Sequence, residues 1–403
     1  MIIGIDASRA NLKRKTGTEW YSFYLIKNLA RIDKENKYLL YLNEPASPEL
    51  ESAVKDNPNF TFKLLKWPFQ SFWTLGRLTL EMIWRRPDVL FIPAHTMPLV
   101  YGRKTVNTIH DIAFMRDNSL YRSLGVKTNG SFSKKVINAL VYLFTLGRYR
   151  SQSLDYLDWS TKFALKKAKK IITVSNFTKK EILNIYPKTK AEKIKVIHNG
   201  YNDNLYKVNN DQAQIKAVLE KYDLEQPYFL YVGRIEKKKN TPALIEALAI
   251  LRYSQPEIKE KLVLIGDASF GFDEVKYVIE EFNLNNDVYM PGWVDEADLP
   301  YIFNGASAFI FPSKHEGFGI PLLQAMACGL PVAASDIPVF REVAGEAMLY
   351  FDHNDSRAIA EAMAKLALNQ ELKNDLRERG LAWVKNFSWE KCARETLKEI
   401  TDI

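Results

Sequence analysis

The chain has 403 residues, too many for one ordinary domain and enough for two domains with full hydrophobic cores. Apolar residues at 47% and charged residues at 26% are ordinary for a soluble globular protein, and the longest apolar run, 136–146, is too short to span a bilayer. The net charge is +8, and the two cysteines show no metal or redox spacing, which favours a reduced, cytosolic chain.

Short apolar runs alternate with amphipathic helical stretches along the whole chain. The opening, MIIGIDASRA, goes directly into a strand pattern without a secretory signal, so we expect a cytoplasmic location. In the first half the expected strands are 2–7, 38–43, 89–94, 105–111, 170–175 and 194–199. Unbroken apolar runs of this kind, separated by helices, predict a parallel sheet covered on both faces.

A polar stretch, NGYNDNLYKVNNDQAQ, separates the two halves, and we expect a hinge near 201–210. In the second half the expected strands are 228–233, 261–266, 288–292, 308–313, 331–335 and 347–352. The predicted fold class is therefore α/β, with two doubly wound domains that face a cleft. Ligands of such folds bind at the carboxyl ends of the strands.

Proline residues predict the start of two helices. In NTPALIEALAILR, Thr241 is expected to cap a helix and Pro242 to take its first position. In SKHEGFGIPLLQAMACGLPV, we expect a short helix over 322–328, with Pro321 at its start and Gly329 as its left-handed stop.

The loop in front of this second helix has the composition of an anion site. The residues 317–319 are Gly, Phe and Gly, and their amides would lie at the positive end of the helix dipole. Glu316 lies at the same place, and a carboxylate suggests a second, hydroxyl-bearing group beside the anion. The pattern predicts a ligand with both an anionic and a hydroxyl-bearing part.

Distinctive residues follow other expected strands as well. Arg234 and the lysines 237–239 follow the first strand of the second half, His110 follows the strand that begins at 105, and Gly17 lies in a turn before a helix. Because the carboxyl ends of parallel strands meet at one edge of a sheet, these residues converge. A diphosphate would be bound by Arg234, one or more of the lysines and the amides of 317–319.

The positive charge is concentrated in the segment 121–170. It contains eleven Lys or Arg against two Asp, a net charge of +9, which leaves −1 for the other 353 residues. Within it, SFSKKVINALVYLFTLGRYR joins an apolar core to basic flanks, which is typical of an interfacial helix. We expect this segment to dock on an anionic membrane surface; a buried helix with a solvated basic rim is the alternative.

Six segments, in order over nearly the whole chain, resemble the retaining glycosyltransferases of the two-Rossmann-domain type (GT-B), specifically family 4, or glycosyl transferases group 1. They are GIDASR with TGTEWY, IHDIAF, KKIITVSNFTKKEI with IKVIHNG, YVGRIEKKKN, PSKHEGFGIPLLQAMACGLPVAASD, and FSWE. The resemblance implies an acceptor-side Rossmann-like domain over 1–205, a nucleotide-sugar-binding Rossmann-like domain over 206–385, and a C-terminal helix over 386–403 that crosses back to the first domain.

The resemblance also implies the site residues. Catalytic roles fall on His110, Arg234, Lys239 and Glu316, and donor-binding roles on Gly17, Val294, Gly317, Phe318, Gly319, Ile320 and Gln324. His110 would touch the donor sugar, Glu316 its hydroxyls, and the backbone around Val294 the base. Gln324 stands where the family usually has a second Glu for the ribose; an amide still accepts one hydroxyl, at a loss of about 1 kcal/mol of binding.

No Asp of the sequence is followed by another Asp two residues on, so the metal-binding DxD motif is missing. Arg234, Lys239 and the helix-end amides would stabilise the departing diphosphate instead. The resemblance implies the same metal-independent route, with retention of anomeric configuration, front-face attack and no cofactor. The predicted enzyme moves a hexose, mannose among the candidates, from a nucleotide-diphosphate sugar to a glycan or lipid-linked acceptor in polysaccharide biosynthesis.

Three alternatives stay open. One is a sugar-nucleotide epimerase or phosphorylase on the same fold, although no distinctive lysine site for pyridoxal phosphate is present. Another is a nucleic-acid-binding protein that uses the basic segment; the RNP pattern is missing and aromatic residues are not interleaved with the basic ones in such a pattern, so we expect no nucleic acid partner. The third is a relative that binds a nucleotide sugar without catalysis. The residues leave the sugar, base, acceptor, linkage and oligomeric state open.

Overall fold

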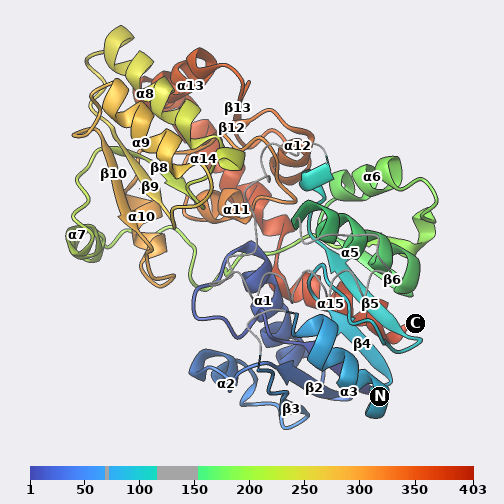
Figure 1. Ribbon diagram of the computed structural model, residues 1–403. Coiled ribbons are helices and arrows are strands. Elements are labelled where there is room, and N and C mark those ends of the chain that lie inside the picture. The colour runs from blue at the N-terminus through green and yellow to red at the C-terminus, as the bar shows by residue number, and fades with distance from the viewer. Residues whose placement is uncertain (69–71, 116–152) are drawn as a thin grey trace. The chain divides into compact units, whose positions relative to one another are not determined.

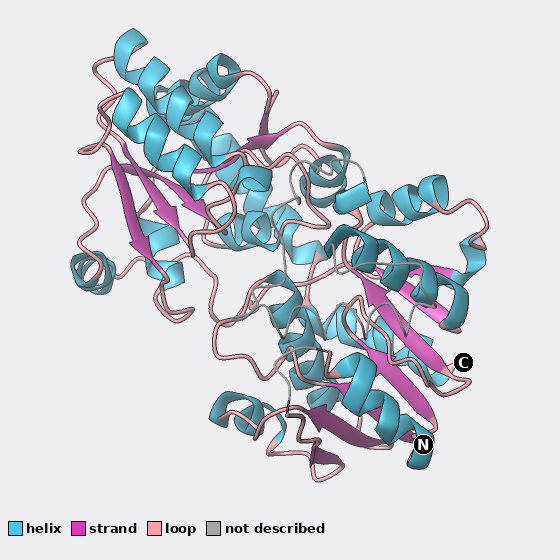
Figure 2. Cartoon of the chain, in the orientation of Figure 1, coloured by secondary structure: helices cyan, strands magenta, loops and turns pink. Residues whose placement is uncertain are grey.

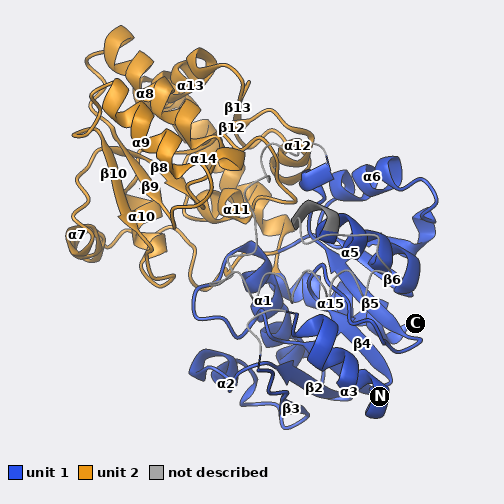
Figure 3. Ribbon diagram, in the orientation of Figure 1, with its two compact units in different colours: residues 1–199, 389–403 blue, residues 200–388 orange. Residues whose placement is uncertain are grey.

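The computed structural model describes residues 1–68, 72–115 and 153–403, which form two compact units. Unit 1 comprises residues 1–199 with 389–403, and unit 2 comprises residues 200–388 (Figure 3). The chain passes from one unit to the other at 199–200, at the start of the polar stretch, and returns at 388–389. The expected α/β fold with two parallel sheets is confirmed (Figures 1 and 2).

The described part of unit 1 contains a seven-stranded parallel sheet in the order β3-β2-β1-β4-β5-β6-β7. Its strands are β1 (Ile2–Asp6), β2 (Lys37–Leu42), β3 (Phe60–Leu64), β4 (Val89–Ile92), β5 (Thr105–Ile109), β6 (Lys170–Thr173) and β7 (Ile194–Val196). All four residues of β4 and all five of β5 are buried, as a central strand covered on both faces requires. Six of the seven strands match expected ones; β3 was missed.

β3 was missed because it is an edge strand. Its five residues, FTFKL, pair with β2 along one side only, and just the first residue is fully buried. The Phe60 ring stacks on that of Tyr38 at 4.1 Å between centroids. A short edge strand needs no continuous apolar run, so the pattern that marks the central strands is missing here.

Helices flank the sheet of unit 1. They are α1 (Gly17–Ile32), α2 (Pro48–Val54), α3 (Thr79–Trp84), α5 (Ser153–Lys167), α6 (Asn176–Ile185) and α15 (Trp389–Thr401). α15 is the last helix of the chain, and it packs against α1, the first: the Trp389 ring stacks on Tyr24 at 5.5 Å, and Lys170 pairs with Glu399 at 2.8 Å. The C-terminal helix therefore belongs to unit 1.

Residues 200–388, all of them described, form a six-stranded parallel sheet in the order β10-β9-β8-β11-β12-β13. Its strands are β8 (Tyr228–Val232), β9 (Lys261–Ile265), β10 (Val288–Gly292), β11 (Ala308–Phe311), β12 (Val332–Ser335) and β13 (Leu349–Phe351). All six were expected. Aromatic rings fill the core around β11, where Phe309 and Phe311 stack at 5.5 Å and Phe311 stacks on Phe340 at 5.6 Å.

The helices of unit 2 are α7 (Gln212–Lys221), α8 (Thr241–Ser254), α9 (Phe272–Glu281), α10 (Leu299–Gly305), α11 (Ile320–Ala327), α12 (Pro338–Ala344), α13 (Ser356–Leu368) and α14 (Gln370–Trp383). α8 packs against α9 and α13, and α11 packs against α14 (Figure 1). No helix in the described ranges is both long and apolar enough to cross a bilayer.

Two helix starts differ from the expectation. α11 begins at Ile320, before Pro321, because Gly319 adopts a left-handed φ of 102° and is the capping residue. α8 begins at Thr241, and the cap is Asn240 with φ 58°, not Thr241. In both cases a left-handed residue turns the chain one position earlier than the proline signal indicates. The expected stop of α11 is confirmed, since Gly329 has φ 69°.

Candidate functional site

The strand order of each sheet reverses at one point, and the expected site residues lie there. In unit 2 the reversal falls between β8 and β11, which are neighbours in the sheet but far apart in sequence. The loop after β8 carries Arg234 and Lys239, and the loop after β11 carries Glu316. In unit 1 the reversal falls between β1 and β4. Open α/β sheets bind ligands at such switch points.

The two loops at the unit 2 switch point are joined by an ion pair. The Lys239 ammonium donates to Glu316 Oε1, and the Ser313 hydroxyl donates to the same oxygen at 3.0 Å. The side chains of Lys239 and Glu316 are only 16% and 12% exposed, and Lys239 Nζ also lies 5.8 Å from the centroid of the Phe311 ring. The backbone of Lys314 donates to Lys238 at 3.1 Å. The cation and the carboxylate are therefore fixed together at the carboxyl end of β11.

Arg234 stands on a rigid backbone and presents its side chain to solvent. The buried Tyr231 hydroxyl donates to the Arg234 carbonyl at 2.8 Å, and burial keeps the pKa of that phenol well above its usual value. The neighbouring loops are packed backbone to backbone: a Cβ at Gly266 would come within 2.1 Å of the Gly233 carbonyl oxygen. Only glycine permits this approach, which packs the loop after β9 against the start of the loop that carries Arg234 and Lys239.

In the segment 317–319, in front of α11, the backbone groups rather than the side chains are available to a ligand. Phe318 is 3% exposed and packs edge-on against Phe387 at 5.9 Å, so its ring belongs to the core of unit 2. Gly319 adopts its left-handed turn with the Phe340 ring 3.0 Å from where a Cβ would be. Ile320 begins the helix and the half-buried Gln324 lies one turn further along it. The structure therefore brings 317–320 and Gln324 together with Lys239 and Glu316.

Val294 is buried at 2% exposure and follows β10, two strands from β8. The strand ends on Gly292, whose carbonyl accepts the Gly266 N–H at 3.0 Å. Gly292 has φ 80°, and a Cβ there would meet nothing within 4 Å. The Val294 side chain faces the core, so only its backbone is available to a ligand.

In unit 1, His110 lies directly after β5 and is fixed from two sides. Its Nε2 bonds the Pro93 carbonyl at 2.9 Å, and the Tyr21 ring packs edge-on at 4.7 Å. Burial is the main cause that lowers the pKa of His110 below its ordinary value, against the bond to Pro93 and the charge of Asp111. The imidazole is therefore neutral near pH 7. Because Nε2–H is donated to a carbonyl, Nδ1 carries the lone pair and can accept a hydrogen bond.

Gly17 is the first residue of α1 rather than part of a preceding turn. Glu19 accepts the backbone N–H of Thr16 at 3.2 Å in a capping box, and it pairs with Arg9 at 3.2 Å. A Cβ at Gly17 would meet nothing within 4 Å. The helix start is therefore held by its neighbours and not by a tight contact at the glycine. Gly17 and His110 both lie in unit 1, on α1 and at the end of β5.

Two polar residues of unit 1, the buried Asp6 and the half-buried His95, were missed from the sequence. Asp6, at the carboxyl end of β1, accepts from the Ser8 hydroxyl at 2.6 Å and from the Thr74 hydroxyl at 3.2 Å; burial raises its pKa. His95 follows β4 and bonds the Thr161 hydroxyl; burial lowers its pKa to about 4. The available signal was a polar residue at or shortly after the end of an apolar strand: Asp6 is the last residue of β1, and His95 follows the end of β4 by three residues. In the ranges 1–68, 72–115 and 153–403, no group of three or more His, Cys, Asp or Glu is placed to hold a metal ion.

Comparison with known proteins identifies the family. The model of "Glycosyl transferases group 1" matches residues 211–383, and that of "Glycosyltransferase Family 4" matches residues 15–205. "O-antigen chain mannosyltransferase B" of Escherichia coli is 33% identical over 261 residues, 64% of this chain and 67% of that protein. The chain belongs to the GT-B glycosyltransferases. It is a hexosyltransferase that uses a nucleotide sugar, and the expected enzyme class is confirmed.

Other relatives of this glycosyltransferase extend the comparison. "O-antigen chain mannosyltransferase RfbU" of Salmonella typhimurium is 26% identical, with 78% of this chain and 74% of that protein covered. The chain spans only 29% of "Serotype-specific mannosyltransferase WbdA" of Escherichia coli, at 26% identity. Among solved structures, Anabaena Alr3699/HepE in complex with UDP and glucose superposes with a TM-score of 0.69 at 19% identity, covering 100% of this chain and 99% of that one. At that identity the likeness shows the fold alone.

Proposed function

We propose that this glycosyltransferase moves mannose from a nucleotide-diphosphate mannose to a glycan or lipid-linked acceptor in polysaccharide biosynthesis. The observation that carries the proposal is the Lys239–Glu316 pair, which joins a cation and a hydroxyl acceptor at the switch point, next to the start of α11. Support for mannose comes from the relatives, since the Escherichia coli and Salmonella typhimurium proteins are named mannosyltransferases.

We propose that Arg234, Lys239 and the amides of 317–319 stabilise the negative charge of the diphosphate. Negative charge grows on the diphosphate as the glycosidic bond breaks, and fixed positive groups stabilise that charge most in the transition state. Both loops are held by hydrogen bonds and close backbone packing, so the donors need little reorganisation. With these groups in place, we propose that transfer proceeds without a metal ion or other cofactor.

At the sugar, Glu316 accepts hydrogen bonds from hydroxyls and His110 contributes the Nδ1 lone pair. The neutral state of His110 suits this role, because an imidazolium would offer no acceptor. The reaction retains the anomeric configuration: the acceptor attacks from the face that the diphosphate leaves, and the departing phosphate takes the proton of the acceptor hydroxyl. No carboxylate forms a covalent intermediate. This course rests on the family resemblance.

The nucleoside end is assigned to residues of unit 2 and the glycine of α1. Gln324 accepts one ribose hydroxyl through its amide oxygen, and the backbone around Val294 holds the base. Gly17, where a Cβ would meet open space, lets the donor approach the backbone at the start of α1. The open position at Gly17 supports this assignment, because no packing contact with the described residues explains the glycine there.

We further propose that the enzyme is cytoplasmic and binds the inner face of the membrane through the basic segment 121–170. Residues 121–152 lie outside the described residues, whereas α5 carries the end of the segment, including Lys162, Lys166 and Lys167. Co-sedimentation with liposomes that contain or lack anionic lipid tests the proposal. Binding that ignores lipid charge, or that survives replacement of Lys134, Lys135, Arg148 and Arg150 by Gln, contradicts it.

A panel of nucleotide sugars tests the activity. GDP-mannose, UDP-glucose, UDP-galactose and UDP-N-acetylglucosamine are each incubated with the enzyme and scored for release of nucleotide and for the sugar product. We expect turnover with a mannosyl donor. Conversion of the donor into an isomeric nucleotide sugar would favour the epimerase alternative, and a gel shift with oligonucleotides tests the nucleic-acid alternative.

A further inference from the structure

Unit 2 contains a cavity at the opposite end of its strands from the loops of Arg234 and Glu316. It has a volume of about 300 Å³. Ser307 and Pro331 line it, and these residues directly precede β11 and β12. The Glu316 loop follows β11 instead. The four residues of β11 therefore separate the cavity from the Glu316 loop, and a strand of that length spans about 13 Å.

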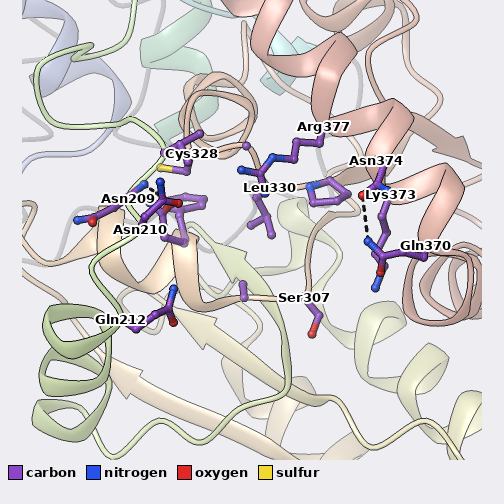
Figure 4. A pocket seen from close by; sticks show the side chains of 16 residues that line it. Asn209, Asn210, Gln212, Ser307, Cys328, Leu330, Gln370, Lys373, Asn374 and Arg377 are labelled. Atoms are coloured by element: carbon purple, nitrogen blue, oxygen red, sulfur yellow. Dashed lines mark hydrogen bonds between the residues drawn. The ribbon is translucent and has the colours of Figure 1, made fainter.

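The walls of the cavity come from four segments: the chain at 208–212, the residues 303–307 at the end of α10, the turn at 328–331 and the first half of α14 (Figure 4). From α14 come Gln370, Lys373, Asn374 and Arg377. The lining contains two cations and no carboxylate. Within the described residues, neither the Lys373 ammonium nor the Arg377 guanidinium has an ion-pair or hydrogen-bond partner. Two cations one helical turn apart thus face a cavity without a counter-charge.

The Arg377 side chain is exposed, and its guanidinium packs against a glycine on one side. Gly329 ends α11 with φ 69°, and a Cβ on it would lie 3.2 Å from Arg377 Nε and 3.1 Å from Val208 Cγ2. The guanidinium therefore lies against the bare glycine at the end of α11. Figure 4 shows the Arg377 side chain among the residues that line the cavity. Its planar N–H groups match the geometry of a phosphate.

Amide side chains supply the rest of the polar surface. Asn210 and Gln212 lie on one wall, and Gln370 donates to Asn374 at 2.9 Å on the other. Each amide offers both a donor and an acceptor, which is what a ligand with several hydroxyls requires. The volume lies at the lower end of the range for small-molecule sites, which suits a single sugar ring better than a nucleotide sugar.

We propose that this cavity binds a phosphorylated monosaccharide, with Lys373 and Arg377 on the phosphate and the amides on the sugar hydroxyls. The site is separate from the proposed donor site. Its ligand is recognised through both its phosphate group and its sugar ring. Inorganic phosphate alone would leave the amide side chains without a partner, and a neutral sugar alone would leave the two cations without one.

Isothermal titration calorimetry with mannose 6-phosphate, mannose and inorganic phosphate tests the proposal. We expect mannose 6-phosphate to bind the wild-type protein at least tenfold more tightly than either of the other two. The double variant Lys373→Gln with Arg377→Gln should weaken that binding at least tenfold, because two charge-assisted contacts are lost. The charge-preserving variant Lys373→Arg with Arg377→Lys should stay within about tenfold of wild type.

The matched control is Arg379→Gln, on the same helix, where an exposed arginine pairs with Asp375 at 2.7 Å outside the cavity. It should leave mannose 6-phosphate binding unchanged. Circular dichroism and urea unfolding of every variant verify that the protein is folded. The proposal is overturned if the wild-type protein does not bind mannose 6-phosphate, if inorganic phosphate binds equally well, or if the double Gln variant binds as tightly as wild type.

Discussion

Replacing Lys239 by Met removes the cation that joins the two loops of the switch point. Losing one partner of a fully buried ion pair costs about 3–5 kcal/mol of stability. The side chains of Lys239 and Glu316 are 16% and 12% exposed, so solvent screens the carboxylate left behind, and the Ser313 hydroxyl remains bonded to it at 3.0 Å. We therefore expect a loss of about 2 kcal/mol in the free energy of unfolding.

The effect on catalysis should be larger than this loss of stability explains. At 25 °C a protein with ordinary stability stays folded after a loss of about 2 kcal/mol. Removal of one fixed donor to a developing negative charge typically lowers kcat about 10²–10³-fold. Because the cation acts mainly on the leaving group, we expect kcat to fall by that factor while the KM for the donor changes less.

A double variant separates the two effects. Lys239→Met combined with Glu316→Gln leaves no unpaired charge, so stability measured by urea unfolding should recover while kcat stays low. Lys261→Met is the control, because it breaks an exposed pair with Glu225 elsewhere in unit 2 and should change neither quantity by much. A kcat of Lys239→Met within threefold of wild type would show that the cation has no role at the leaving group.

Four further predictions follow from the same sites. Arg234→Ala should lower kcat by orders of magnitude with an unchanged urea midpoint, since its side chain is exposed; near-normal turnover would contradict its role. Gln324→Glu should tighten donor binding by about 1 kcal/mol or leave it unchanged in calorimetry, and loss of activity would contradict the ribose assignment. Gly17→Val should keep the thermal midpoint but raise the KM for the donor, because its Cβ meets nothing in the protein; an unchanged KM would remove Gly17 from the site. The pKa of His95 is lowered by burial to about 4, so its stabilising effect is complete above the unfolded pKa near 6.5 and declines as the pH falls toward 4. Urea unfolding at pH 7.5 and 4.5 should show a decrease about 2.5 kcal/mol larger in wild type than in His95→Gln, and equal decreases would contradict the buried neutral state.

The central strands and the switch-point loops could be predicted because their signals are local. An unbroken apolar run followed by polar residues marks both a buried strand and the edge of the sheet at which those polar residues lie, as with β8 and the Arg234 that follows it. β3 gave no such run, since an edge strand is covered on one side only. The proline signals placed α8 and α11 correctly, to within two residues.

The contacts of the site could not be predicted, because they join segments that are distant in sequence. Nothing in YVGRIEKKKN indicates that Lys239, rather than Lys237, faces Glu316; Lys237 pairs with Glu274 at 3.5 Å instead. The burial of Phe318 depends on Phe387, and that of Asp6 on Thr74, and both partners lie on other elements. The cavity between α14 and the end of α11 combines four segments that are distant in sequence, so no single stretch of the sequence indicates it.

The most direct test of the proposed mechanism measures the hydrolysis of the donor in the absence of an acceptor. The quantities followed are the rate of release and the anomeric configuration of the sugar that is released. With excess EDTA and GDP-mannose, one-dimensional proton NMR follows the first mannose released, before mutarotation equilibrates its anomers. The account predicts that release continues in EDTA and that the first product has the anomeric configuration of the donor. Release that stops in EDTA, or a first product with the opposite configuration, would contradict it.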